Sequence, residues 1–597
     1  MKITQSLLSW RSFHGKNIQS PLRSRSWAFL PWAAAILTLL LSTASSSYAG
    51  SAKWKASPAT GNWHTAGNWS AGGPPNASAD TATFASSSIT GVSISAGTEV
   101  NGIVFNAGAS PFTITANPTF TLTVSGVGIT NNSGITQNFV TAVDGAGNFG
   151  TISFTNSATA GSLTAFTNPG GTVSGAGGGF TEFANIATAG NGIFTNNGGT
   201  VSGADGGFMA FFDTSTASNG TFTTNGSAVS GADGGFTQFL ATSTAGSGTF
   251  TTNGSAVSGA FGGGFTQFFD TSTASSGTFT TNGGAVVGAN HGHLDFNNTS
   301  TASNATLIAN AGPGSAGDEA GGIIRFFDDS TGGTARVEVF GTGTGDTTNG
   351  SLDISFHNAP GVSIGSIEGS GAVFLGAVNL TVGGNNLSTT FSGVMQDGGQ
   401  NGGTLGSLTK IGNGKLTLSN ATTYTGGTTV TKGTLLVANR TGSATGTGAV
   451  QINKGTLGGT GKITGAVTVG TGTSSGAILL PGKSATAPGT LTINSALTFN
   501  SLSTYKCVLN RTTPIAGKIT ALGVTTNSGA SFTFVDVGTG TLTVGTVFTV
   551  INNTSAASIA GTFSNLADGS VFASNGNNFQ ASYTGGTGND LTLTVVP

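Results

Sequence analysis

Four consecutive segments of this chain are copies of one unit, and this repetition limits the fold more than any other feature. The copies begin at Gly192, Gly220, Gly248 and Gly277, so the period is 28 residues, lengthened once to 29. Each copy holds three short apolar stretches separated by Asn-Gly or Gly-Gly turns. A propeller blade needs four strands and usually about 40 residues. The period therefore predicts a parallel β-solenoid, in which equivalent residues of successive coils stack about 4.8 Å apart.

Equivalent residues of the copies form columns. Two columns of Phe and one of Val recur, and we expect all three to be ladders of inward-facing side chains. The columns are Phe166, Phe194, Phe222, Phe250 and Phe279; Phe183, Phe211, Phe239, Phe268 and Phe296; and Val173, Val201, Val229, Val257 and Val286. Extended over the whole exported chain, the period gives roughly twenty coils with a cap at each end.

Composition supports an all-β fold. Of 597 residues, 101 are Gly and only 7% are charged, which disfavours helices. The 39 Phe residues and a mean hydropathy of +0.14 argue against disorder. Cys507 is the one cysteine, so no internal disulfide forms, and we interpret it as a small buried hydrophobe rather than a nucleophile.

The first fifty residues are typical of an export signal. Basic residues precede an uncharged apolar run over residues 27–41, and Ser47-Tyr48-Ala49 supplies small residues before a cleavage site between Ala49 and Gly50. An uncleaved anchor is the alternative, but Pro31 interrupts the run. After cleavage the net charge becomes −7, so we expect no nucleic-acid partner and a secreted or cell-surface location.

Residues 408–437, LTKIGNGKLTLSNATTYTGGTTVTKGTLLV, closely resemble the autotransporter-associated β-strand repeat, and a degenerate continuation follows at 446–470. The resemblance covers roughly residues 365–500 and implies a right-handed β-helix in a secreted or surface-displayed bacterial passenger. It rests on Leu408, Lys410, Gly412, Gly414, Leu416, Leu418, Tyr424, Gly426, Gly427, Thr428, Val430, Gly433, Leu435 and Val437.

The two ends also resemble large bacterial exported β-strand repeat proteins. Trp54, Trp63 and Trp69 could form a carbohydrate-binding platform or a hydrophobic plug over the first coil, and the plug is favoured. Residues 501–597 lack the Trp and most of the Tyr of a translocator barrel. We therefore expect no such barrel there, and outer-membrane association, if any, through another protein.

The predicted organisation has six parts. They are a signal peptide (1–49), an N-terminal cap with the first coils (50–160), the 28-residue repeats (161–310), a charged elaborated coil (311–365), the autotransporter-associated repeat region (366–500), and C-terminal coils with a cap (501–597).

Charged residues are densest between Asp318 and Glu338, where a polysaccharide lyase or hydrolase could place its acids and bases. A solvated insertion explains the same residues, and no known catalytic motif surrounds them. The candidates are Asp328, Asp329, Glu319, Arg325 and Arg336, with His357 nearby. Of these, Asp328 and Asp329 join the three Trp residues as candidate ligand-binding positions.

Three weaker patterns have simpler explanations. His291 and His293 alternate as on one strand face but lack a third metal ligand, and GGTGND at 585–590 occurs once, whereas calcium sites of this kind need successive turns. Thr pairs such as Thr214 and Thr216 recur once per coil and could bind ice, or simply form a polar turn.

The sequence thus predicts an exported, non-enzymatic β-solenoid that acts as a structural or adhesive element. We expect no cofactor and no metal, and extracellular surfaces or glycans as partners; the oligomeric state stays open. The alternatives are a polysaccharide-degrading β-helix enzyme and a flat-surface binder such as an ice-binding protein.

Overall fold

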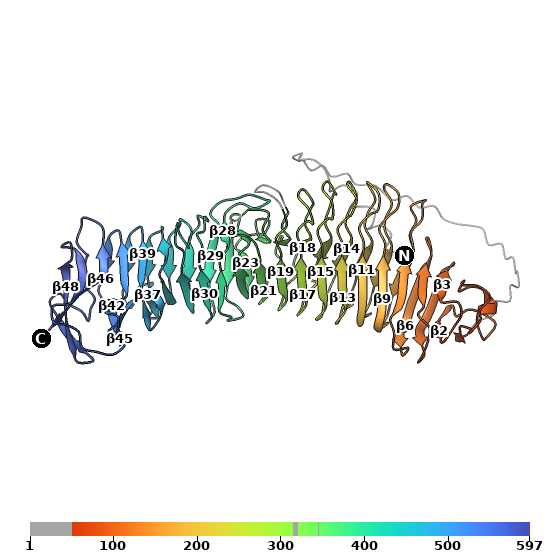
Figure 1. Cartoon of the computed structure of the whole chain (residues 1–597), viewed down its shortest axis with the longest axis horizontal. Coiled ribbons are helices and arrows are strands. Elements are labelled where there is room, and N and C mark those ends of the chain that lie inside the picture. Colours follow the sequence, from red (N-terminus) through yellow and green to blue (C-terminus); the bar gives the residue numbers. More distant parts are fainter. Residues whose placement is uncertain (1–49, 314–319, 344–345) are drawn as a thin grey trace, which may run out of the picture. The chain divides into compact units, whose positions relative to one another are not determined.

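The computed structural model describes residues 50–313, 320–343 and 346–597, which belong to one compact unit. The predicted signal peptide, with Ala49, lies outside the described residues, and Gly50 is exposed at their start. The described chain is a β-solenoid of about 18 turns of about 28 residues, as the period predicts (Figure 1). Its only helical segment within the described residues is the short 3-10 turn η2 (Ala66–Asn68).

The first sheet is entirely parallel and runs through the N-terminal two thirds of the solenoid. Its strands pair in chain order, and each comes from a different coil. They are β1 (Ala52–Lys53), β2 (Ala77–Phe84), β4 (Thr98–Phe105), β6 (Thr121–Asn131), β8 (Thr151–Phe154), β10 (Phe180–Phe183), β12 (Phe208–Phe211), β14 (Phe236–Phe239), β16 (Phe265–Phe268), β18 (His293–Phe296), β20 (Ile323–Phe326), β22 (Ser351–Asp353), β25 (Ala372–Phe374) and β28 (Val394–Gln396).

The second sheet runs from the first coils to the C-terminal ones, and successive coils again pair in parallel. Two short strands, β38 (Ala487–Pro488) and β42 (Ile515–Ala516), add antiparallel hairpins to it. Its main strands are β3 (Gly91–Ile94), β5 (Thr113–Ala116), β7 (Gln137–Thr141), β9 (Ser162–Asn168), β11 (Asn191–Asn196), β13 (Thr221–Thr224), β15 (Thr249–Thr252), β17 (Thr278–Thr281), β19 (Thr306–Ala309), β21 (Arg336–Val339), β24 (Ser366–Gly369), β27 (Thr389–Phe391), β30 (Lys415–Leu418), β32 (Thr434–Val437), β34 (Gly455–Gly459), β37 (Ala477–Ser484), β41 (Thr504–Asn510) and β45 (Ser531–Val537).

Two further sheets complete the C-terminal coils. The third sheet is parallel and the fourth becomes antiparallel from β46 onward, which closes the end of the solenoid. The third contains β23 (Gly361–Ile364), β26 (Asn379–Val382), β29 (Ser407–Lys410), β31 (Thr428–Val430), β33 (Val450–Ile452), β36 (Val467–Val469), β40 (Leu497–Phe499) and β44 (Val524–Thr526); the fourth contains β35 (Lys462–Ile463), β39 (Thr490–Ile493), β43 (Lys518–Ala521), β46 (Val547–Asn553), β49 (Asp590–Val596), β48 (Asn577–Gly585) and β47 (Val571–Ser574).

The two predicted Phe columns are ladders in the core. The rings of Phe222 and Phe250 stack with centroids 4.5 Å apart, and those of Phe239 and Phe268 stack at 4.6 Å. The ladders also meet edge to face, since Phe239 lies 5.6 Å from Phe250 at 74°. Alternation along each strand places these rings inside and leaves the residues between them outside.

The Val column is not part of the core, which corrects our expectation. Each copy forms two strands and a single Thr bridge, such as Thr216 to Thr244, and the third apolar stretch is a loop between the second and first sheets. Val229 and its equivalents are half-buried on this loop, and Val286 is 43% exposed. The Gly residues that flank the Val allow the chain to leave the sheets before it reaches the next coil.

Cys507 is buried, as expected, and burial raises the pKa of its thiol to about 12. The described part of the chain contains no helix with the length and apolar character needed to cross a membrane.

Candidate functional site

A column of polar side chains runs along the outer face of the first sheet. The third residue of each strand points outward because the second and fourth pack into the core. Over seven successive coils this position varies between acidic, neutral and basic side chains. From β10 to β22 the column reads Glu182, Ala210, Gln238, Gln267, Asp295, Arg325 and Asp353.

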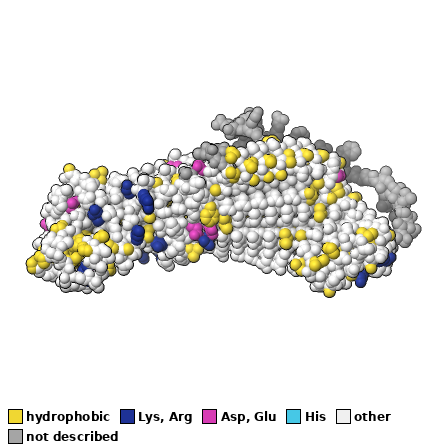
Figure 2. Space-filling view, viewed as in Figure 1, with side chains coloured by type: hydrophobic (Ala, Val, Ile, Leu, Met, Phe, Trp, Pro, Cys, Tyr) yellow, Lys and Arg dark blue, Asp and Glu magenta, His cyan; other side chains and the backbone are white. Residues whose placement is uncertain are grey.

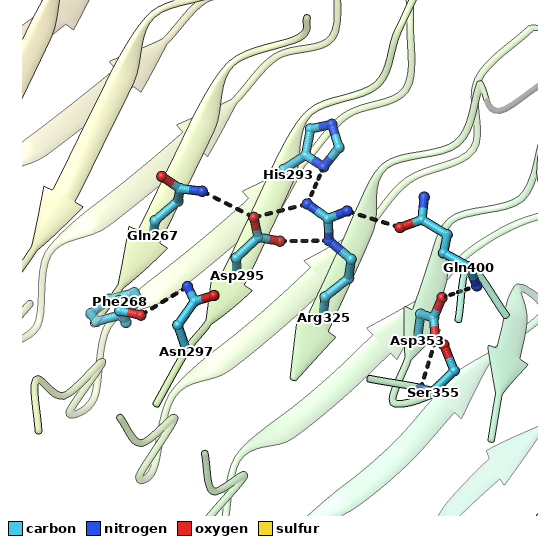
Figure 3. A network of polar contacts seen from close by, with 9 residues as sticks. All are labelled: Gln267, Phe268, His293, Asp295, Asn297, Arg325, Asp353, Ser355 and Gln400. Atoms are coloured by element: carbon cyan, nitrogen blue, oxygen red, sulfur yellow. Dashed lines mark hydrogen bonds and ion pairs between the residues drawn. The ribbon is translucent and has the colours of Figure 1, made fainter. Parts of the chain in front are cut away.

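Arg325 is the centre of this column (Figure 3). Its guanidinium forms a two-point ion pair with Asp295, with Nε to Oδ1 at 2.7 Å and Nη2 to Oδ2 at 2.8 Å. Nη2 also donates to Nδ1 of His293 at 2.8 Å. Gln267 continues the network by donating to Asp295 Oδ2 at 3.2 Å. The arginine is therefore held in one geometry by two residues of the neighbouring strand β18, and Gln267 of β16 supports one of them.

A loop between β28 and β29, residues 397–406, folds back over this network. Gln400 Oε1 accepts a hydrogen bond from Arg325 Nη1 at 2.8 Å, and the backbone N–H of Gln400 donates to Asp353 Oδ2 at 2.9 Å. Asp397 holds the neck of the loop by accepting bonds from Gly406 and Thr425. Beside the loop lies a cavity of about 140 Å³ lined in part by His291, Asp353 and Gln400.

Asp353 and Glu182 are carboxyl groups of this column with different environments. Asp353 is fully buried and accepts from two backbone N–H groups, those of Ser355 and Gln400. Glu182 is half-buried, and its carboxylate accepts a hydrogen bond from the hydroxyl of Ser153 at 2.8 Å. Burial raises the pKa of Glu182, because the charged form loses water without gaining a cation.

Asp328 and Asp329, predicted as ligand-binding positions, are exposed at a corner of the coil. Asp328 Oδ2 accepts the backbone N–H of Asn298, 3.1 Å away on the preceding coil, and Asp329 Oδ1 accepts from Asn358 Nδ2 at 3.1 Å. Both carboxylates thus have partners that a structural role explains. Their part in ligand binding stays a prediction.

The remaining charged candidates that the structure describes do not converge with Arg325. Arg336 lies on the second sheet and pairs with Glu368 at 2.5 Å, which raises its pKa. His357 bonds to the backbone oxygens of Asn358 and Ser330. Glu319 and Asp318 lie outside the described residues. Strands β20 and β21 of this charged coil pair with the strands of the preceding coil without a shift in register, so the coil continues the stack.

Trp54, Trp63 and Trp69 are fully buried over the first coil. Trp63 and Trp69 meet edge to face at 4.8 Å, and all three rings pack against Phe84. Each indole N–H donates to a backbone oxygen. No ring face is open to a sugar in this arrangement, which favours the plug over the carbohydrate platform.

His291 and His293 lie side by side, with ring centroids 4.4 Å apart, and His293 also stacks on Phe265. Residues 50–313, 320–343 and 346–597 contain no group of three His, Cys, Asp or Glu side chains placed to hold a metal. In the GGTGND segment, Asp590 accepts the backbone N–H of Asn553 at 2.9 Å within an antiparallel hairpin.

The Thr pairs project outward, as their spacing predicts, with Ser215 buried between Thr214 and Thr216. Their hydroxyl groups bond to the backbone. Thr214 donates to the carbonyl oxygen of Asn185 on the preceding coil, and Thr216 accepts the N–H of Ser218. These bonds stabilise the corner of each coil.

Sequence reasoning singled out Arg325 but missed Asp295, Gln267, Gln400 and Asp353. The signal was present for Gln267 and Asp295, because the third position of this strand varies in charge from copy to copy while the Phe that follows it stays constant. The contact with Gln400 joins residues 75 apart, which no repeat pattern indicates.

Comparison with known proteins agrees with the repeat observed in the second half. Residues 408–437 match the family model described as passenger-associated-transport-repeat. A similar curated protein, the adhesin BmaC autotransporter of Brucella suis biovar 1 (strain 1330), is 36% identical over 132 residues. That match covers 21% of this chain and 4% of the relative, so the chain corresponds to a small part of that protein's length. This chain is a β-solenoid that carries a passenger-associated transport repeat.

Proposed function

We propose that this protein is an exported, non-enzymatic solenoid that acts as an adhesive or structural element outside the cell or on its surface. The observation that carries the proposal is the transport repeat at residues 408–437 within an uninterrupted stack of coils. The similarity to part of an autotransporter adhesin supports it. The mechanism is avidity, since a repeated face offers many weak contacts in fixed register.

The test is binding of residues 50–597 to an array of glycans and matrix proteins. Distributed adhesion predicts that Asp328→Ala with Asp329→Ala, or Arg325→Gln alone, lowers binding only partly, because the other coils still engage the surface. Complete loss from either change would contradict avidity and point to one localised site. Binding to none of the arrayed surfaces would favour a purely structural role.

A polysaccharide lyase or hydrolase is the second candidate. It is favoured by Asp353, which lines the cavity, and by Asp295, which lies two strands away in the same column. Against it, the carboxylate of Asp295 is already paired with Arg325, and that of Asp353 already accepts hydrogen bonds from two backbone N–H groups. Incubation with acidic polysaccharides, followed by measurement of new reducing ends, tests this candidate. Degradation that Asp353→Asn abolishes would replace the adhesive proposal.

A further inference from the structure

Charge is strongly segregated along the solenoid. No Lys or Arg lies between Lys55 and Arg325, while eleven Asp or Glu do. Between Glu368 and Asp536 the balance is reversed, with ten Lys or Arg and a single acid, Asp397. Because coils stack in chain order, this division in sequence becomes an acidic half and a basic half of the molecule.

The basic half carries exposed cations. Figure 2 shows dark-blue side chains gathered over the C-terminal half of the solenoid. Lys432 and Lys454 precede β32 and β34 at the same turn of paired coils, and Lys415 begins the neighbouring β30. Six of these cations are exposed and form no ion pair with another described residue: Lys415, Lys432, Arg440, Lys454, Lys462 and Lys483.

The acidic half carries charge that its local structure does not need. Asp213 and Asp270 are exposed at the coil corner, where each accepts the backbone N–H of the preceding coil at 2.8 Å. Asn185 and Asn298 make the same bond with a neutral amide at 3.0 and 3.1 Å. The corner requires an acceptor but not a negative charge, so the Asp charge is available for another role.

The two halves cannot neutralise each other within one molecule. Six strand steps of the second sheet separate the coil of Asp270 from that of Lys432, which at about 4.8 Å each is about 30 Å. The Debye length at physiological ionic strength is about 8 Å. Each half therefore presents an uncompensated field to a partner of opposite charge.

We propose that two copies of this chain associate side by side with their axes antiparallel, so that the acidic half of each lies against the basic half of the other. A two-fold axis satisfies both halves at once and closes the assembly at a dimer. Parallel pairing would oppose like charges. Each half of the chain is thus complementary to the other half of a second copy. This association does not depend on which extracellular surface the solenoid binds.

The first measurement is the mass of residues 50–597 by sedimentation at about 20 mM and about 300 mM salt, because screening weakens charge pairing. A dimer at low salt that dissociates at high salt is expected. A monomer at both salt concentrations would overturn the proposal.

Two triple variants replace charged residues with neutral residues that other coils carry at the same positions. Asp213→Asn, Asp270→Asn and Asp328→Asn together keep the corner bonds seen at Asn185 and Asn298. In the second variant, Lys415→Thr introduces the residue of the paired position Thr434. Lys432→Asn and Lys454→Asn introduce the residue that Asn413 supplies in their column. Each triple variant is expected to lose the dimer, while its circular dichroism and its melting temperature at about 300 mM salt, where the wild type is also a monomer, stay unchanged.

A polyanion is the competing partner for the basic coils, and dextran sulfate is the probe. In one outcome, the lysine variant loses binding to dextran sulfate and the Asp variant sediments as the wild type does. The basic coils then bind polyanions, and the dimer proposal fails. Loss of the dimer in both variants supports it, because only self-association requires both charges.

Discussion

At the scale of single residues, each coil from Asn156 to Asp328 turns its first-sheet corner through a residue with a left-handed backbone. The corner residues have φ between 52° and 58°, and most are Asn or Asp, whose side chains accept the N–H of the preceding coil. Ala241, with φ 55°, interrupts this ladder. The corner residues are Asn156, Asn185, Asp213, Ala241, Asp270, Asn298 and Asp328.

Ala241→Asn is expected to stabilise the protein by about 1 kcal/mol, because it supplies an acceptor for the N–H of Asp213 and suits the backbone better. The urea midpoint of residues 50–597 measures the change. Asn298→Ala, which removes an existing acceptor, should shift the midpoint the other way. Equal midpoints for all three proteins would contradict the ladder.

Lys410 is a cation placed inside the solenoid. Its register neighbours in the third sheet are Val382 and Val430, and its ammonium donates to the backbone oxygens of Ile411, Gly412 and Lys432. Burial lowers its pKa to about 8, from 10.5. The unfolded chain therefore binds more protons than the folded one between these two values.

Stability should accordingly rise with pH between about 8 and 10.5, as the cost of a buried charge disappears. Lys410→Met should remove that slope without a new cavity. Urea midpoints of wild type and variant at three pH values across the window measure it. Wild-type and variant midpoints that change in parallel across the window would contradict the assignment.

At the scale of elements, the ladders decide stability. Phe250 stacks on Phe222 and Phe279 at 4.5 Å on both sides, so Phe250→Ala should cost about 3–5 kcal/mol. Phe261, on the loop, is 62% exposed, and Phe261→Ala should change stability by less than about 0.5 kcal/mol. Urea unfolding compares them, and similar losses would mean that the loop is part of the core.

The repeat predicts which residues stack in columns, but not which columns face the core. The repeat predicted stacked columns, and Phe222 with Phe250 confirm them. It also predicted an inward Val column, which is wrong, because every column of a repeat has the same period whether it faces the core or solvent. The difference lies in the neighbours, since Gly residues around Val229 take the chain out of the sheets.

At the scale of the whole molecule, the ends of the stack need protection. Trp63 donates its indole N–H to Pro75 O at 3.0 Å, and its own carbonyl accepts from Trp69. The three Trp residues cover the first coil, whose strand edge would otherwise be open to association. The antiparallel strands β47 to β49 protect the other end.

Trp63→Ala should open the N-terminal cap, because it removes a buried ring and its hydrogen bond at once. The remaining Trp fluorescence should shift to longer wavelength, and light scattering should rise as the first strands pair between molecules. Ala66→Ser, on the exposed side of the same segment, is the control. Unchanged emission and scattering in Trp63→Ala would show that the cap does not depend on this ring.

The sequence by itself determined the solenoid, its period, the Phe ladders and the transport repeat. Stacking favours similar residues at the same position of successive coils, so these features are visible as a repeat in the sequence. Only the tertiary structure decided which columns face the core, and it alone brought Gln400 to Arg325 and Asp353. Such contacts come from a loop that crosses several coils. Its position depends on three-dimensional packing and leaves no period to read.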